Sequence, residues 1–169
     1  MSQRIRLGAM LCVMAFVTAA VAQAPPPEVK PARGPSASLA LEGAQAAIAA
    51  CAAQGYLVAV TVIDSAGELK VVIAADGVPP GHAVPHSALK AQTALAYRIS
   101  SAQVQERTKT DAAFAAEIEA NAKLLARAGG QPLLSHGEII GAIGVSGAPG
   151  GDKDDACTSA GVAKIRERL

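Results

Sequence analysis

The stretch from Asp76 to Tyr97 constrains the fold most, because a loop that excludes regular structure runs directly into a helix. Pro79–Gly81 forbids a helix or a strand, whereas Pro85 fits the first turn of a helix, where a backbone N–H has no partner. From Ser87 onward, small and apolar residues recur at helical spacing, which predicts one face packed on a core. The sequence therefore presents His82 at the entrance of a helix.

The first 22 residues have the layout of a secretory signal peptide. Two arginines precede an apolar run from Leu7 to Val21, which is shorter than the ~20 residues of a membrane span, so an uncleaved anchor is the less favoured alternative. Two A-x-A sites compete, and we expect cleavage after Ala22, because cleavage after Ala24 would place Pro25 at the scissile bond. The mature protein should then be periplasmic or secreted.

Removal of the signal leaves a chain of single-domain size with nearly balanced charge. Subtracting 22 residues, two of them arginine, from 169 leaves 147 residues with 13 basic and 14 acidic side chains. This balance, without a basic cluster, argues against nucleic acid and anionic membranes as partners. No second apolar run is long enough for a bilayer, so we expect a soluble protein after cleavage.

Two cysteines, Cys51 and Cys157, belong to the mature chain, because Cys12 lies in the signal. An oxidising compartment favours a disulfide between them, which would close a long loop and stabilise the fold. Two separate buried thiols are the alternative, and the spacing does not decide between them.

Residue spacing divides the rest of the chain into a linker and one domain. A proline-rich linker covers residues 23–38 and lacks the apolar content to fold alone. The expected elements of the domain at 39–169 are a helix opened by Ser38 over 39–54, strands over 56–63 and 68–75, the loop and helix described above, short helices over 102–108 and after Thr110, strands over 133–134 and 138–146, and a final helix from 152. Residues 123–128 fit either a continuing helix or a new strand. Hairpins separated by helices predict an α+β domain, with an antiparallel sheet covered by helices that include the first and the last.

Four stretches stand in an order that is typical of one family. They are IDSAGELKVVIAADG, SALKAQTALAYR, GGQPLL and GEIIGAIGVSGAPGGDKDDACTSAG. From about Leu39 to the C-terminus, the chain resembles the GlcG/HbpS-like haem-binding family, which also occurs as the C-terminal domain of PduO proteins. The resemblance implies a five-stranded antiparallel sheet with packed helices, homo-oligomers such as dimers or rings, and binding of haem or iron.

The resemblance also implies where a ligand would bind. Exported relatives carry a histidine just before the Lys-Ala helix, and His82 stands in that place, eight residues before Lys90. This chain departs from the family pattern by an extra loop residue, by His86 where a serine is common, and by Gln131 in a stretch that is often glycine-rich.

Haem iron accepts His, Cys, Met or Tyr as axial ligand, and all three methionines lie in the signal. The remaining candidates are His82, His86, His136, Tyr56, Tyr97 and the two cysteines if reduced. His82 is favoured as the iron ligand, because a loop exposes it and a helix fixes its base; a merely solvated histidine is the alternative. His86, four residues on, could join His82 on a divalent metal, although no third ligand is evident. His136 is expected in a tight turn.

Lys90 and Arg98, about 12 Å apart on one helix at a rise of 1.5 Å per residue, could meet the haem propionates. A solvated side chain or a surface salt bridge is the default for both. The predicted cofactor-binding set is therefore His82, His86, Lys90, Tyr97 and Arg98. Because the mature chain has only three aromatic residues, the pocket should be aliphatic and hold haem loosely, at a subunit boundary.

Other functions find less support in the residues. Gly141, Gly144 and Gly147 could bring backbone to a phosphate, but three nearby aspartates repel phosphate and no P-loop lysine follows, so close packing is favoured. No G-x-S-x-G motif or metal cluster indicates catalysis, and no catalytic residue is assigned. We expect an exported haem-binding protein that sequesters or senses haem or iron. Haem degradation, binding or processing of a small organic acid, and a structural oligomer without haem are the alternatives.

Overall fold

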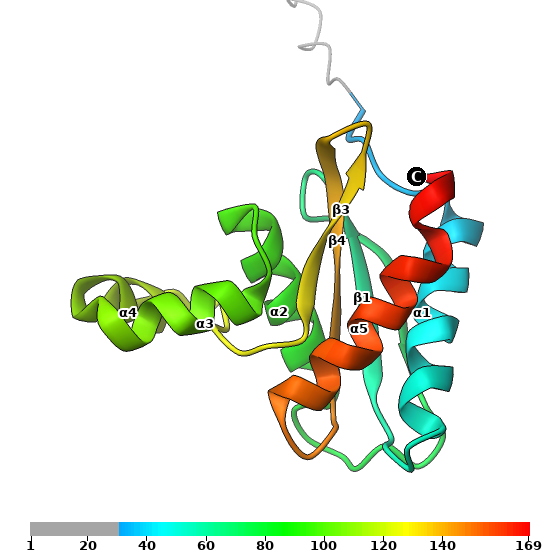
Figure 1. The fold of residues 1–169 in the computed structure, drawn as a ribbon, viewed down its shortest axis with the longest axis horizontal. Helices are drawn as coiled ribbons and strands as arrows, with labels where there is room; N and C mark the ends of the chain where they lie inside the picture. Colours follow the sequence, from blue (N-terminus) through cyan, green and yellow to red (C-terminus); the bar gives the residue numbers. More distant parts are fainter. Residues whose placement is uncertain (1–30) are drawn as a thin grey trace, which may run out of the picture. The chain divides into compact units, whose positions relative to one another are not determined.

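A computed structural model describes residues 31–169, so the predicted signal peptide and the first half of the predicted linker, residues 23–30, lie outside the described residues. The elements are α1 (Ala37–Ala52), β1 (Ala59–Asp64), β2 (Leu69–Ala74), α2 (Ala83–Tyr97), α3 (Ser101–Thr110), α4 (Ala112–Ala120), β3 (Gly130–Ser135), β4 (Glu138–Ser146), α5 (Gly151–Ile165) and a final 3-10 turn (Arg166–Arg168) (Figure 1). Within this range, no helix combines the length and apolar character needed to cross a membrane.

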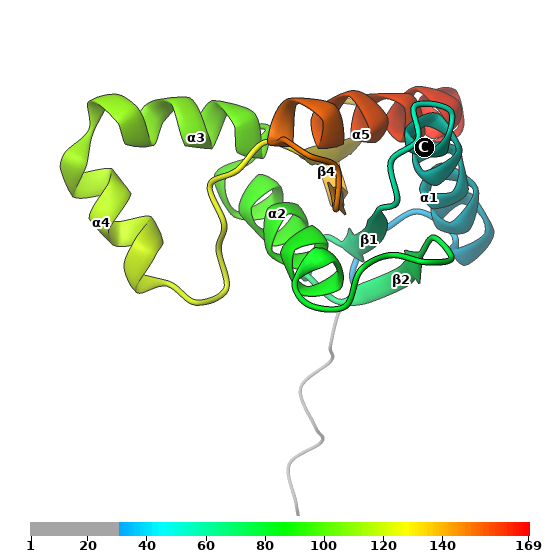
Figure 2. The ribbon, with the colours of Figure 1, turned by 90° about the horizontal axis from the view of Figure 1, so that it is seen from below.

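The described strands form one antiparallel sheet in the order β2-β1-β4-β3. The predicted α+β class is confirmed, with four strands in the described residues where the resemblance implied about five. Figures 1 and 2 show α1 and α5 side by side on one face and α2 on the other. The central strand β1 is buried along its whole length, because alternate side chains such as Val62 and Ile63 enter the two different cores.

Glycines of β4 let α2 lie close to the sheet. A Cβ atom at Gly144 would collide with the backbone oxygen of Ser87 on α2. From the neighbouring strand β1, the Thr61 hydroxyl donates to Ser87 Oγ at 2.7 Å, while the Ser87 hydroxyl donates to the backbone oxygen of Val84. The prediction that these glycines permit close packing is therefore confirmed at Gly144.

A disulfide between Cys51 and Cys157 joins the end of α1 to the middle of α5. Both cysteines are fully buried, and the two helices also meet where Gly161 faces the backbone of Gly43. Of the two alternatives for these cysteines, the structure has the disulfide. It anchors the helix layer opposite α2.

Element boundaries differ from the prediction at several positions. The first helix begins two residues earlier, because Ser36 rather than Ser38 accepts a hydrogen bond from the backbone N–H of Leu39 and caps it. Asp111 rather than Thr110 caps α4 by accepting from the N–H of Phe114. Residues 123–128 are neither helix nor strand, since their backbone groups bond to side chains of α2 and α3 instead.

Candidate functional site

The first turn of α2 places His82 and His86 against each other. His82 is the N-cap residue, and its backbone oxygen accepts from the N–H of His86 at 2.8 Å. The ring centroids lie 4.7 Å apart, with an interplanar angle of 37°. His82 is exposed and His86 is half-buried, so one face of this histidine pair is open to solvent.

Lys90, one turn further along α2, is buried rather than solvated. Its Nζ donates to Asp154 Oδ2 at 2.6 Å and to the backbone oxygen of Val145 at 3.0 Å. The other carboxylate oxygen of Asp154 accepts from the N–H of Ala148 at 2.9 Å. The ion pair therefore ties α2 to the end of β4 and to the first turn of α5.

Burial sets the proton affinities in this site. It lowers the pKa of Lys90 and raises the pKa of Asp154, while the bond between the two groups opposes both shifts. The pKa of His86 is lowered, first by burial and then by the positive fields of His82, Arg127 and Lys90. The imidazole of His86 is therefore neutral at neutral pH and keeps a lone pair.

The histidine pair, Lys90 and Asp154 line a pocket of about 140 Å³. The rest of its wall comes from Arg127, Ser146 and the glycine-rich loop of residues 147–151. Arg127 is exposed and forms no ion pair among residues 31–169. The pocket, which we call the histidine pocket, offers two imidazoles and one free guanidinium.

The chemistry of these side chains fits haem at the mouth of the pocket but not inside it. Pockets that enclose a drug-sized ligand have about 300–1,000 Å³, more than the histidine pocket provides. An exposed imidazole can bind iron from the mouth, and a guanidinium can pair with a carboxylate. Most of a bound haem would thus remain outside this chain's pocket.

Tyr97 and Arg98 lie at the other end of α2, away from the histidine pocket. The Tyr97 hydroxyl donates to Glu117 at 2.9 Å, and its ring packs edge-on against Phe114 at 5.1 Å between centroids. Arg98 ends the helix in a left-handed conformation with φ of 60°. The structure therefore brings together three of the five predicted cofactor-binding residues: His82, His86 and Lys90.

His136 also lies outside the histidine pocket. It occupies the predicted turn between β3 and β4, with φ of 49°, and its side chain is exposed beside the hydroxyl of Ser135.

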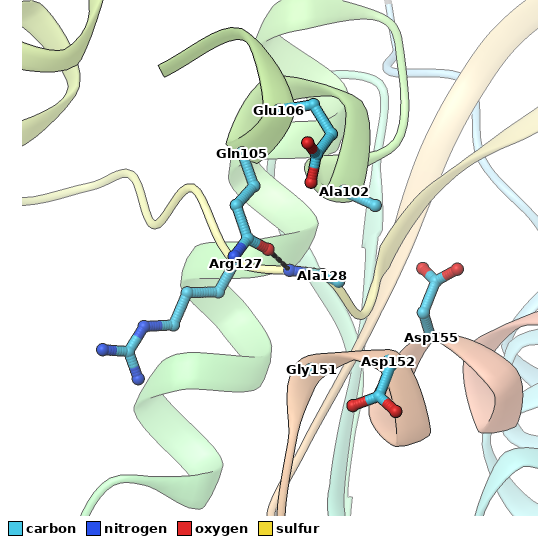
Figure 3. Close-up of a pocket in the computed structure, with 8 residues that line it drawn as sticks. All are labelled: Ala102, Gln105, Glu106, Arg127, Ala128, Gly151, Asp152 and Asp155. Carbon is cyan, nitrogen blue, oxygen red and sulfur yellow. Dashed lines mark hydrogen bonds between the residues drawn. The ribbon is translucent and has the colours of Figure 1, made fainter. Parts of the chain in front are cut away.

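A larger pocket of about 740 Å³ adjoins the histidine pocket through Arg127 and Gly151. Figure 3 shows its carboxylates, Glu106, Asp152 and Asp155, and shows the Arg127 side chain pointing away from both aspartates. These carboxylates would repel the propionates of a haem. The histidine pocket is therefore the candidate site despite its smaller volume.

Sequence reasoning missed Asp154 and Arg127 as parts of the site. For Asp154 a signal existed, because Cys157 and Gly161 follow at helical spacing on the buried face of α5. Arg127 lies in a segment without regular structure, where no periodicity could reveal its neighbours.

Comparison with known proteins identifies relatives of this architecture. The family model HbpS-like, described as haem degrading protein HbpS-like, matches residues 36–163. A double mutant of Streptomyces reticuli HbpS is 29% identical with a TM-score of 0.73, over 86% of this chain and 97% of that one. No curated protein sequence matches.

Two more distant structures share the fold. A PduOC:haem complex is 21% identical with a TM-score of 0.71, over 78% of this chain and 95% of that one. The Klebsiella pneumoniae protein ORFY is 17% identical with a TM-score of 0.74, over 86% of this chain and 99% of that one.

Proposed function

This chain belongs to the HbpS-like family, and on that premise we propose that it binds haem at the mouth of the histidine pocket, with His82 as the iron ligand. The observation that carries the proposal is the exposed imidazole of His82, held at the start of α2 beside a free guanidinium. The PduOC:haem complex supports it, because a protein of the same fold is described with haem.

Each residue of the pocket has a distinct part in this proposal. His82 supplies the lone pair to the iron, which is the redox-active centre that haem would bring. Arg127 pairs with a propionate, because its guanidinium is exposed and unpaired within the described part of the chain. Lys90 is already bonded to Asp154, so it positions α2 rather than contacting the cofactor.

We also propose where the protein acts and how the site is completed. The protein is exported by a signal cleaved after Ala22 and acts in the periplasm or outside the cell, which the disulfide between Cys51 and Cys157 supports. Because the histidine pocket is small and open, the far face of the haem is covered by a second copy of the chain. Bound haem is held for sequestration or sensing.

A haemin titration followed by the Soret band tests haem binding. Wild type and His136→Ala, which removes a histidine outside the pocket, should give a saturable shifted band. His82→Ala should lose the band or bind at least about tenfold more weakly, a change of about 1.4 kcal/mol. The absence of a saturable shift in wild type would refute the proposal, and equal binding by His82→Ala would refute the assigned ligand.

A further inference from the structure

Two imidazoles lie together at the start of α2, whereas the proposed haem site needs only one of them. His82 and His86 are four residues apart in a helical turn, an arrangement that puts two imidazoles on one helix face, as in helical zinc sites. Their ring centroids lie 4.7 Å apart. With metal–nitrogen bonds of about 2.0–2.1 Å, two imidazoles on one ion have centroids about 4.5 Å apart at a right angle and about 5.2 Å apart at the tetrahedral angle.

From this geometry we propose that His82 and His86 chelate a divalent transition-metal ion, with water completing its coordination. The observed centroid distance of 4.7 Å lies between these two values, so it is compatible with two imidazoles on one ion. The open face of His82 leaves room for the water ligands. By the Irving–Williams order, Cu²⁺ should bind more tightly than Ni²⁺ or Zn²⁺.

The charges around the pair decide how tightly an ion binds. Lys90 is balanced by Asp154 at 2.6 Å, so its ammonium adds little net repulsion. Arg127 also lines the pocket, and it forms no ion pair with a carboxylate among residues 31–169. Arg127→Gln should therefore strengthen metal binding while it weakens the haem binding proposed above, because the guanidinium repels a metal ion and attracts a propionate.

The metal proposal shares His82 with the proposed haem site but does not require haem. His86→Gln separates the two, because it removes one of the two metal ligands and leaves the proposed iron ligand in place. If His86→Gln loses metal and keeps haem, both proposals stand. If wild type binds metal but not haem, only the haem proposal fails, and if it binds haem but not metal, only the metal proposal fails.

Calorimetric titration of the tag-free protein with CuCl₂, NiCl₂ and ZnCl₂ tests the chelate. We expect one Cu²⁺ per chain in wild type and in His136→Gln. Because the second imidazole binds intramolecularly, His82→Gln and His86→Gln should each weaken binding by on the order of tenfold or more. Circular dichroism verifies that each variant is folded, and electron paramagnetic resonance of the Cu²⁺ complex should show two nitrogen ligands. Equal affinity in wild type and in either pocket variant, or an equal loss in His136→Gln, would overturn the proposal.

Discussion

Lys90 Nζ and Asp154 Oδ2 lie 2.6 Å apart, with side chains only 3% and 4% exposed. Their sequence separation is 64, and their contact fixes α2 against the first turn of α5. Both side chains line the histidine pocket. The position of the histidine pair therefore depends on a buried ion pair.

Lys90→Met should destabilise the fold by about 3–5 kcal/mol, because it leaves the Asp154 carboxylate buried without its partner. The double variant Lys90→Met/Asp154→Leu should lose less than the sum of the two single losses, since it removes both charges. Urea unfolding measures these differences, with exposed Lys123→Met as the control. A loss below about 1 kcal/mol in Lys90→Met would contradict the role of the pair.

Acid should weaken the fold through His86. Its folded-state pKa is lowered by burial, so the unfolded chain takes up this proton first as the pH falls below about 6.5. The stabilisation that comes from keeping His86 neutral is thus fully present above that pH, and it is lost as the pH falls below it. His86→Gln should reduce the loss of stability between about pH 7.5 and about pH 5.5, measured by urea unfolding. An NMR titration midpoint for His86 above 6.5 would show that the sign is wrong.

Loss of the disulfide should have a large effect, because it closes a loop with a sequence separation of 106. The chain-entropy model gives about 4–5 kcal/mol for a loop of this length. Cys51→Ala/Cys157→Ala should therefore unfold at much lower urea concentration, and reduction of wild type should match it. Protein exported with its own signal and purified after signal cleavage should show no reactive thiol after denaturation. Two reactive thiols would exclude the bond.

Gly144→Ala should push α2 away from the sheet, because the new Cβ meets the backbone oxygen of Ser87. Overpacking of this kind costs about 1–3 kcal/mol. Gly43→Ala is the matched control, since its Cβ would meet mainly the flexible end of the Ile165 side chain. Thermal unfolding should separate the two variants, and equal effects would mean that α2 has room to move.

Elements with strong local signals were predictable from the sequence. The bounds of β4 are as predicted, because an uninterrupted apolar run follows a turn, and α2 begins near Pro85 because the preceding prolines and glycine exclude other structure. The burial of Lys90 was not predictable from local periodicity, since its partner lies on α5. Arg127 enters the pocket from an irregular segment, which only the tertiary packing places. Tyr97 shares a helix with the histidines, but the length of that helix carries it out of the site.

Ligand rescue is the sharpest test of haem ligation by His82. His82→Gly should remove the shifted Soret band of the haemin complex, and added imidazole should restore it by occupying the vacated position. His86→Gly should keep the band without imidazole. An unchanged band in His82→Gly would contradict iron ligation by His82. A band that is lost in His86→Gly and restored there by imidazole would assign the ligand to His86 instead.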